Sequence, residues 1–160
     1  MSARISPGRI VITRRGRRKG ELTPRDFVEI AIAEAESSQA RAAASTEHRM
    51  HLAAYAARPD IEALVHAHPL GLSAYAVRGE VPDVNALDEA RAFVRAIGLV
   101  AYAPSGSEAL AAAVAAALPG RDVLILRDHG ALSVGASVEE ALAKLEIAEH
   151  LAMTLLLARR

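Results

Sequence analysis

Short apolar runs bounded by turn residues recur along the chain and predict β-strands. The β-branched run RIVIT stands between Pro7-Gly8 and a basic turn, and the run FVEI follows Pro24. The run IEALVHAH is closed by a proline, and DVLILRDHGALSVG is broken by a turn at RDHG. The predicted strands are 9–13, 27–30, 61–68, 99–103 and the two halves of 122–135.

Segments with a 3.6-residue apolar period separate these runs and predict helices. Two of these helices have recognisable starts, because Ser107 can cap one of them and Ser137 opens the capping box SVEE of the other. Residues 34–44 are expected to form a loop or a frayed helix. The predicted helices run from Thr46 to before Pro59, over 70–77, 87–97 and 108–118, and from Ser137 to the C-terminus.

The last predicted helix is apolar on more than one face. Leu151, Leu156 and Leu157 widen the stripe that its other apolar residues form at helical spacing. A helix that is apolar over so much of its circumference predicts a second burial surface, such as a subunit contact.

The order of elements mixes strands with helices, but the connections around 30–45 and 126–136 do not form regular βαβ units. This order predicts an α/β or α+β fold with a mixed or antiparallel sheet. A chain of 160 residues suits one domain, and no internal repeat or linker divides it. We therefore expect a single domain over residues 1–160.

The composition narrows the class of protein. Hydrophobic residues make up 52% of the chain and aromatic residues 3%, which is typical of a globular protein with a core of Ala, Val, Leu and Ile. With 19 basic and 19 acidic residues, the net charge gives no argument for nucleic acid or a membrane as a partner. The sequence shows neither a signal-peptide segment nor a membrane span, so we expect a cytoplasmic protein. Because there is no Cys, a transition-metal site must use His, Asp or Glu.

Two histidines, His66 and His68, stand one residue apart at the end of a predicted buried strand. Residues i and i+2 of a strand share a face, so their imidazoles project side by side and can bind a divalent metal. Catalytic zinc sites use three protein ligands, and His129 in RDHG is the best candidate for the third. The alternative is structural, since a strand-end histidine is commonly a partly buried residue satisfied by hydrogen bonds.

A second polar group is the segment STEHRMH, residues 45–51. It is not the HExxH motif of zinc proteases, because Glu47 precedes the pair and His48 and His51 are three residues apart. Glu47 is either a helix-start residue favoured by the helix dipole or a functional carboxylate. As a functional group it would be a general base, or a metal ligand that substrate displaces.

Taken in order, several segments resemble the class II aldolase/adducin family over nearly the whole chain. These segments are GRIVIT, GELTPRDFVEI, STEHRMHLAAYAARPDIEALVHAHP, VAYAPSGSEAL and LILRDHGALSVGASVEEALAKLEIAEHLA. The combination of HxHP after RPDI with a distal RDHG is specific to that family. The resemblance implies an α/β fold with α/β/α layers and a central mixed, largely antiparallel sheet, and a homotetramer with active sites between subunits.

By this resemblance, His66, His68 and His129 match three zinc ligands for one Zn²⁺ per chain, and Glu47 matches the catalytic carboxylate. The implied activity is that of a zinc-dependent carbon–carbon lyase, most simply retro-aldol cleavage of a small ketose phosphate of the fuculose or ribulose type. Zinc would stabilise the enediolate, and Glu47 would transfer its proton. His48 and His51 match no metal ligand and are expected to pack or support the site.

The chain departs from the family pattern at the two phosphate-binding segments. MSARI matches the loop G-N-[LIM]-S-x-R only from its third position, with Ser2 as the serine, so a preceding helix and the Gly-Asn are missing and we expect a start codon placed too late. The family's TPSG is TRRG here. We expect Arg15, Gly16, Ser45 and Thr46 to bind phosphate, and the alternative for the basic segment is a solvated turn.

The family's proton-donating tyrosine aligns with Ala86, so the proton donor is unassigned. Two alternative reactions on the same zinc centre therefore stay open: decarboxylation of a 3-oxo sugar-acid phosphate and dehydration of methylthioribulose phosphate. The expected partner is a small phosphorylated sugar or keto acid. A non-catalytic binding module resembling the adducin head is a further alternative, against which the histidine triad argues.

Overall fold

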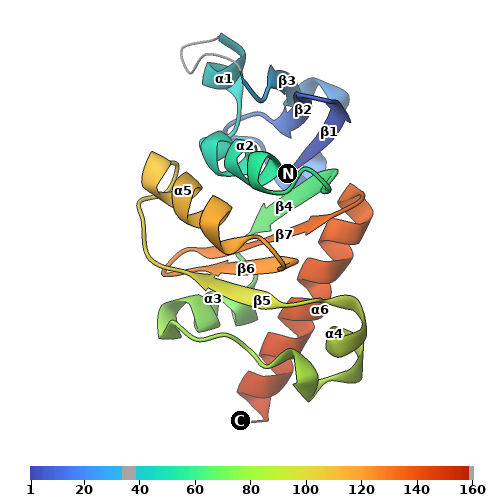
Figure 1. Cartoon of the computed structure of the whole chain (residues 1–160), viewed down its shortest axis with the longest axis vertical. Helices are drawn as coiled ribbons and strands as arrows, with labels where there is room; N and C mark the ends of the chain where they lie inside the picture. The colour runs from blue at the N-terminus through green and yellow to red at the C-terminus, as the bar shows by residue number, and fades with distance from the viewer. Residues whose placement is uncertain (34–38, 159–160) are drawn as a thin grey trace.

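The computed structural model describes residues 1–33 and 39–158. The strands of these residues form one seven-stranded sheet in the order β3-β2-β1-β4-β7-β6-β5 (Figure 1). Within it β5 and β6 are parallel, and the other described neighbours are antiparallel. The strands are β1 (Ser2–Ser6), β2 (Arg9–Thr13), β3 (Phe27–Ala31), β4 (Ala63–Ala67), β5 (Ile97–Val100), β6 (Val123–Leu126) and β7 (Gly130–Gly135).

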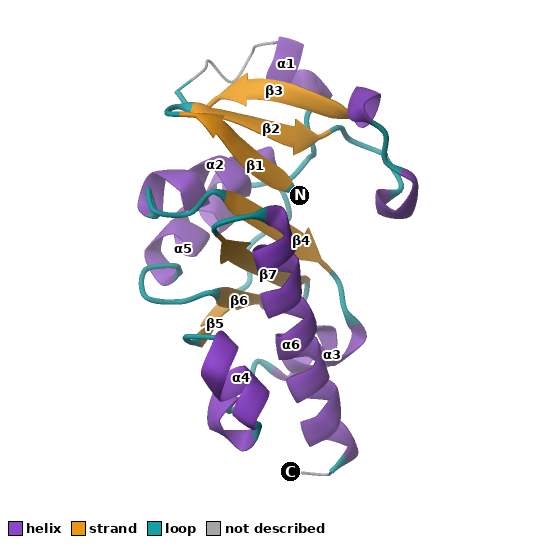
Figure 2. Ribbon diagram, turned by 90° about the vertical axis from the view of Figure 1, so that its right-hand side faces the viewer, coloured by secondary structure: helices purple, strands orange, loops and turns teal. Residues whose placement is uncertain are grey.

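Helices cover both faces of the sheet over strands β4 to β7, so the predicted α/β/α layering is confirmed there. Figures 1 and 2 show α2 and α5 together on one face, and α6 crossing the other face beside α3 and α4. The helices are α1 (Gln39–Ala43), α2 (His48–Ala57), α3 (Leu70–Arg78), α4 (Asp88–Phe93), α5 (Glu108–Ala117) and α6 (Val138–Leu157).

Strand alternation explains why both faces need a cover. In β6, Leu124 and Leu126 belong to the apolar cluster formed with α2 and α5, whereas Val123 and Ile125 belong to the cluster formed with α3 and α6. Successive strand residues point to opposite faces, so a strand buried on both faces reads as a continuous apolar run. The run VLIL is buried at all four positions for this reason.

Two predicted helix starts are confirmed in detail. The hydroxyl of Ser107 accepts the Leu110 N–H at 3.1 Å, and that of Ser137 accepts the Glu140 N–H at 3.1 Å. The carboxylate of Glu140 completes the second cap by accepting the N–H of Ala136 at 3.0 Å. The reciprocal bond of this capping box therefore goes to the residue before the N-cap.

Several element boundaries differ from the prediction. The helix predicted over 87–97 is wrong at its end, because α4 stops at Phe93 and Ile97 instead pairs with Val123 in the parallel β5–β6 ladder. The strand predicted over 99–103 accordingly lies over Ile97–Val100. Strand 61–68 is shortened to Ala63–Ala67. Of the segment 34–44, residues 34–38 lie outside the described part, and α1 follows them.

Strand β1 was not predicted, because its five residues are too few and too mixed in polarity to be recognised as a strand. It is held by antiparallel pairing to both β2 and β4, and by the buried Ser2 side chain. The Ser2 hydroxyl bonds His51 Nδ1 at 2.7 Å and the Tyr55 hydroxyl at 3.0 Å, which connects β1 to α2. Burial raises the pKa of Tyr55 to about 12.

The wide apolar stripe of α6 is only partly used within the chain. Ala141, Leu145 and Ala148 are buried, whereas the side chains of Leu142 and Leu157 are 42% and 77% exposed. Among residues 1–33 and 39–158, we find no helix of the length and apolar character that crossing a membrane requires.

Candidate metal centre

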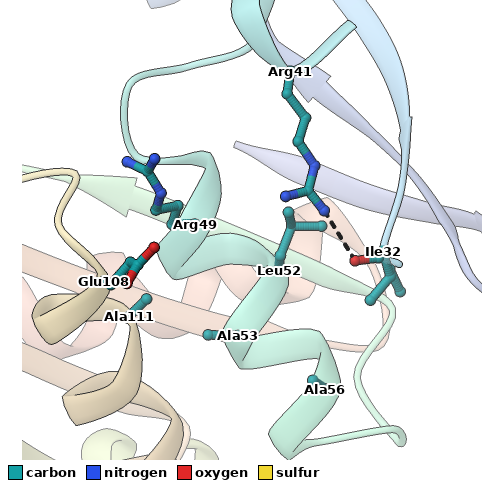
Figure 3. Close-up of a pocket in the computed structure, with 8 residues that line it drawn as sticks. All are labelled: Ile32, Arg41, Arg49, Leu52, Ala53, Ala56, Glu108 and Ala111. Atoms are coloured by element: carbon teal, nitrogen blue, oxygen red, sulfur yellow. Dashed lines mark hydrogen bonds between the residues drawn. The ribbon is translucent and has the colours of Figure 1, made fainter. Parts of the chain in front are cut away.

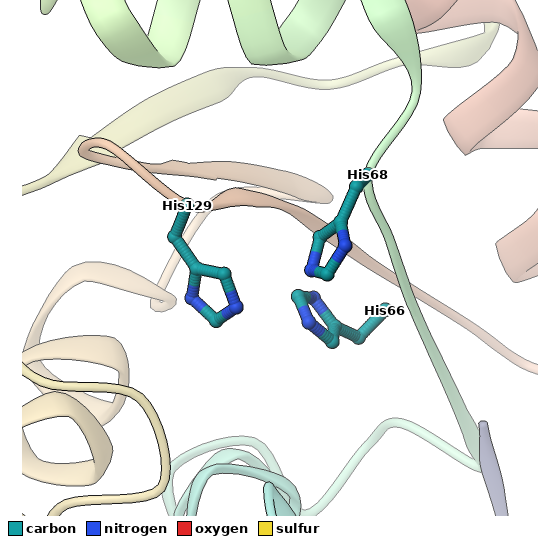
Figure 4. Close-up of side chains that lie close together, drawn as sticks. All are labelled: His66, His68 and His129. Atoms are coloured by element: carbon teal, nitrogen blue, oxygen red, sulfur yellow. The ribbon is translucent and has the colours of Figure 1, made fainter. Parts of the chain in front are cut away.

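Three histidine side chains from two separate parts of the sequence converge on one point (Figure 4). The ring centroids of His66 and His68 lie 4.9 Å apart, and each lies 5.0 Å from the ring of His129. One ring nitrogen from each residue lies within 4.8 Å of those of the other two. The predicted trio is therefore brought together by the fold.

His66 is fixed by the sheet. It lies in β4 opposite Leu132 of β7, on the side of the sheet that α2 and α5 cover, and it is buried. Its Nδ1 donates to the carbonyl oxygen of Ala131 at 2.9 Å. Because Nδ1 carries the proton, the lone pair of the neutral ring is on Nε2, which is the tautomer that a metal ligand needs.

His129 is presented by the tight turn between β6 and β7. The preceding residue, Asp128, has φ 55°, a left-handed conformation in which Asp and Asn are enriched. The N–H of His129 donates to the Leu126 carbonyl at 3.0 Å, which closes the turn. The buried Nδ1 of His129 has no hydrogen-bond partner within the described part of the chain.

His68 lies one residue beyond the end of β4 and is the exposed member of the trio. Its ring packs directly against the backbone of Gly130. A Cβ at position 130 would overlap the His68 ring and lie 2.7 Å from the Ala67 carbonyl oxygen. Gly130 is thus a glycine because the His68 ring occupies the space of its missing side chain.

The donor set fits a zinc ion. Three imidazoles converge, one of them held in the ligating tautomer, and three protein nitrogen ligands are typical of catalytic zinc sites. The Nδ1 of His129, which has no hydrogen-bond partner among the described residues, also fits a site whose polar environment is completed by a ligand.

Glu47 is the N-cap residue of α2, the helix that covers the same face of the sheet as His66. Its side chain is buried, with 6% exposed. One carboxylate oxygen, Oε1, accepts a hydrogen bond from the hydroxyl of Ser105, and the other, Oε2, is buried without a hydrogen-bond partner within residues 1–33 and 39–158. A buried carboxylate with one oxygen held and the other available suits proton transfer.

Sequence reasoning missed Ser105. It lies in the loop between β5 and α5, 58 residues from Glu47. The only local signal is the polar segment Ser105-Gly106-Ser107, which ends in the N-cap residue of α5, and such segments usually serve the helix itself.

A cavity of about 340 Å³ opens beside Glu47. It brings together Arg15 and Thr46 of the predicted phosphate site with Ser105 and His48. The rest of the lining consists of Arg41, Ala42, Arg49 and Gly106. The hydroxyl of Ser45, which was predicted to bind phosphate with Thr46, instead accepts the Glu47 N–H at 3.3 Å.

Other residues of the basic segment are directed elsewhere. Gly16 lines a different cavity together with Arg17 and Arg18. Arg17 pairs with Asp26 at 3.1 Å, and Arg18 pairs with an exposed glutamate at 3.6 Å. Arg15 thus lines the cavity beside Glu47, whereas Arg17 and Arg18 form ion pairs at the surface.

Arg41 and Arg49 were not predicted as site residues. Figure 3 shows both in an adjoining cavity of about 350 Å³, where Arg41 donates to the Ile32 carbonyl at 3.2 Å. Arg49 donates to the Gly106 carbonyl at 2.9 Å. Both arginines line the two cavities, so three arginines from separate segments, counting Arg15, line the cavity beside Glu47.

Ala86, which aligns with the family's tyrosine, is an exposed residue of the 3₁₀ turn Val84–Ala86.

Known proteins of one family resemble this chain over most of its length. The family model for the Class II Aldolase and Adducin N-terminal domain matches residues 1–156. An L-fuculose phosphate aldolase of Methanococcus vannielii is 35% identical over 108 residues, which are 68% of this chain and 58% of that protein. One of Methanococcus maripaludis strain C5 is 32% identical over 143 residues, 89% of this chain and 76% of that protein.

Among solved structures, the l-fuculose-1-phosphate aldolase from Thermus thermophilus superposes with a TM-score of 0.86 at 30% identity, covering 99% of this chain and 81% of that one. The chain therefore spans 58% of one curated relative and larger shares of the other two proteins. On the strength of the family match, the superposition and the converging histidines, the chain belongs to the class II aldolase and adducin N-terminal domain family.

Proposed function

We propose that the chain is a zinc-dependent lyase that cleaves a small ketose phosphate by a retro-aldol reaction, with a substrate of the fuculose- or ribulose-phosphate type. The observation that carries the proposal is the convergence of His66, His68 and His129 in a family whose relatives are named L-fuculose phosphate aldolase. These histidines would hold one Zn²⁺.

A zinc ion bound there would supply Lewis-acid polarisation of a substrate carbonyl. The protein supplies the proton chemistry. Glu47 Oε2 is a buried carboxylate oxygen without a hydrogen-bond partner in the described residues, and it is the atom that we assign to proton transfer at the carbon beside the carbonyl. Ser105 holds the other oxygen, so the carboxylate presents Oε2 in one orientation.

The cavity beside Glu47 supports an anionic substrate. Arg15, Arg41 and Arg49 border it, and Thr46 and Ser105 add hydroxyl groups. Guanidinium groups form strong charge-assisted hydrogen bonds with phosphate oxygens. We assign phosphate binding to Arg15 and Thr46, with the neighbouring Ser45 as a further contact, whereas Gly16 lines a different cavity.

Subunit assembly and location belong to the same proposal. The exposed Leu142 and Leu157 of α6 support association into a homo-oligomer, which we propose to be a tetramer acting in the cytoplasm.

The first test is the zinc content of the purified protein, measured by mass spectrometry. Wild type is expected to carry about one zinc per chain, and a His68→Ala variant is expected to lose it, since catalytic zinc sites use three protein ligands. The matched control is His150→Ala, which removes an exposed histidine of α6 and should leave the zinc in place. A wild type that takes up no zinc when supplied with it would refute the enzyme proposal and favour a binding module.

The second test is a panel of ketose phosphates, 3-oxo sugar-acid phosphates and methylthioribulose phosphate. Cleavage of the carbon skeleton into two products supports the aldolase. Release of carbon dioxide would identify the decarboxylase, and release of water without carbon–carbon cleavage would identify the dehydratase. Glu47→Gln is expected to retain zinc and lower kcat by at least about a hundredfold, within the usual range for a general acid–base group. Wild-type turnover by this variant would remove Glu47 from the mechanism.

A further inference from the structure

The position of His68 is not explained by the sheet. β4 ends at Ala67, and Pro69 is already the N-cap residue of α3, so His68 lies in the one-residue link between a strand and a helix. His66, by contrast, lies within the β4–β7 ladder. The geometry of the exposed histidine therefore depends on what fixes the start of α3.

The start of α3 lacks a cap of its own. The N-cap residue Pro69 has no side-chain hydrogen bond to offer, although its φ is restricted by its ring. The first N–H groups of a helix need acceptors, which an N-cap Ser, Thr, Asp or Asn normally provides. At α3 the acceptor must come from another element.

Glu149 of α6 provides it. Its Oε1 accepts the Gly71 N–H at 2.7 Å, and its Oε2 accepts the Leu72 N–H at 2.8 Å. These are the two N–H groups that a local cap would bind, and a carboxylate is favoured there by the helix dipole. One side chain, 77 residues or more away in sequence, thus replaces the missing cap.

Close packing of α3 on α6 adds to this link. A Cβ at Gly71 would lie 2.9 Å from Met153 Cγ and 3.0 Å from the Met153 backbone nitrogen, so the two helices meet without space for a side chain. The Pro69 carbonyl accepts the Ser73 N–H at 2.9 Å, which ties the residue next to His68 into the same first turn.

We propose that Glu149 is a positioning residue for the metal ligand His68, acting through the first turn of α3. The proposal rests on the metal centre proposed above. The affinity for the metal then depends on the Glu149 carboxylate of α6, which does not itself bind the metal.

The test is the zinc affinity of the metal-free protein, measured by competition with a chromophoric zinc chelator. Glu149→Ala is expected to bind zinc roughly tenfold to a hundredfold more weakly, the usual cost of removing a group that orients a metal ligand. Glu149→Gln is expected to lose less, because its amide oxygen still accepts one of the two N–H groups. It also serves as the informative variant if Glu149→Ala does not fold.

The matched control is Glu140→Ala. Glu140 also lies on α6 and also caps a helix start, since it accepts the Ala136 N–H, but that start is the N-terminus of α6 itself. Thermal unfolding of the metal-free variants should show a loss of stability for both, whereas only Glu149 variants should lose zinc affinity. A merely structural Glu149 would lower the unfolding temperature and leave zinc affinity unchanged.

The outcomes are distinguishable. Zinc bound equally well by wild type, Glu149→Gln and Glu149→Ala would overturn this inference while leaving the metal centre intact. A wild type that binds no zinc would overturn both. Equal weakening by Glu140→Ala and Glu149→Ala would show that the effect is global and would also overturn the inference.

Discussion

The hydroxyl of Ser105 donates a hydrogen bond to Oε1 of Glu47. This contact connects the loop after β5 to the N-cap residue of α2. The other oxygen of the carboxylate, Oε2, is buried and has no hydrogen-bond partner among the residues that the structure describes. The two oxygens of Glu47 are therefore not equivalent. One is held by Ser105, and the other is the oxygen to which we assign proton transfer.

Replacing Ser105 with alanine should therefore slow turnover without disturbing the metal. Loss of one oriented hydrogen bond to a carboxylate is expected to lower kcat about tenfold, which corresponds to about 1.4 kcal/mol. KM and zinc content should stay near their wild-type values, and steady-state kinetics with metal analysis would check all three. Ser105→Thr keeps the hydroxyl and should retain most of the activity. A raised KM with unchanged kcat would mean that Ser105 contacts substrate instead.

Gly130→Ala should disrupt the metal centre through a steric effect alone. The added Cβ would overlap the His68 ring and approach the Ala67 carbonyl oxygen to 2.7 Å, so the ring must move. We expect a loss of about 1–3 kcal/mol in unfolding free energy, the usual cost of overpacking, together with weaker zinc binding. Urea unfolding and zinc competition would measure both.

The control for this substitution is Gly20→Ala. A Cβ at Gly20 meets nothing within 4 Å, and the backbone there is not left-handed, so both quantities should be unchanged. Zinc affinity of Gly130→Ala equal to that of wild type would show that His68 tolerates displacement, contrary to the expectation.

Ser2→Ala should destabilise the attachment of β1 to α2. Ser2 is 2% exposed, and its hydroxyl is bonded to both His51 and Tyr55. Removing one partner from a buried hydrogen-bond network costs about 1–3 kcal/mol, since the remaining polar groups lose an interaction that water cannot replace. A double-mutant cycle with Tyr55→Phe, followed by urea unfolding, would measure the coupling. Strict additivity of the two substitutions would contradict the network.

Asp60 should make a small contribution to stability that disappears in acid. Hydrogen bonds from the Arg58 side chain, at 2.7 and 2.6 Å, lower the pKa of Asp60 to about 2 from 3.8. A carboxyl whose pKa is lowered by folding stabilises the protein above its unfolded pKa, and the effect is lost as the pH falls from about 4 towards about 2. Because Asp60 is 63% exposed, we expect a contribution of only about 0.5 kcal/mol.

The measurement is the unfolding free energy of wild type and Asp60→Asn at about pH 6, where the effect is fully present, and at about pH 2.5, where most of it is lost. The difference in unfolding free energy between the two proteins should be present at the higher pH and smaller at the lower pH. The contributions of the other carboxyl groups are the same in both proteins and cancel in this difference. An equal difference at both values would show that the Arg58–Asp60 pair does not respond to pH as its pKa requires.

Local sequence patterns were sufficient to predict several features of the structure. Apolar runs and breaks placed both strands of 122–135, and serines at helix starts predicted the caps at Ser107 and Ser137. The pairing of His66 with His68 also follows from local geometry, because alternate residues of an extended chain face the same side. These features depend on interactions between residues close in sequence, which a single sequence records directly.

Other features could not be predicted, because the contacts concerned join residues far apart in the chain. The short β1 exists through its pairing with β2 and β4, and α4 ends early because Ile97 joins the parallel ladder to β6. Ser105 meets Glu47, and Glu149 caps α3, only when loops and helices pack on the sheet. Their own neighbours in sequence carry no periodic or capping signal for these partners. Residue types and spacing were thus enough to identify the side chains capable of chemistry, whereas long-range packing established which of them are held in place by others.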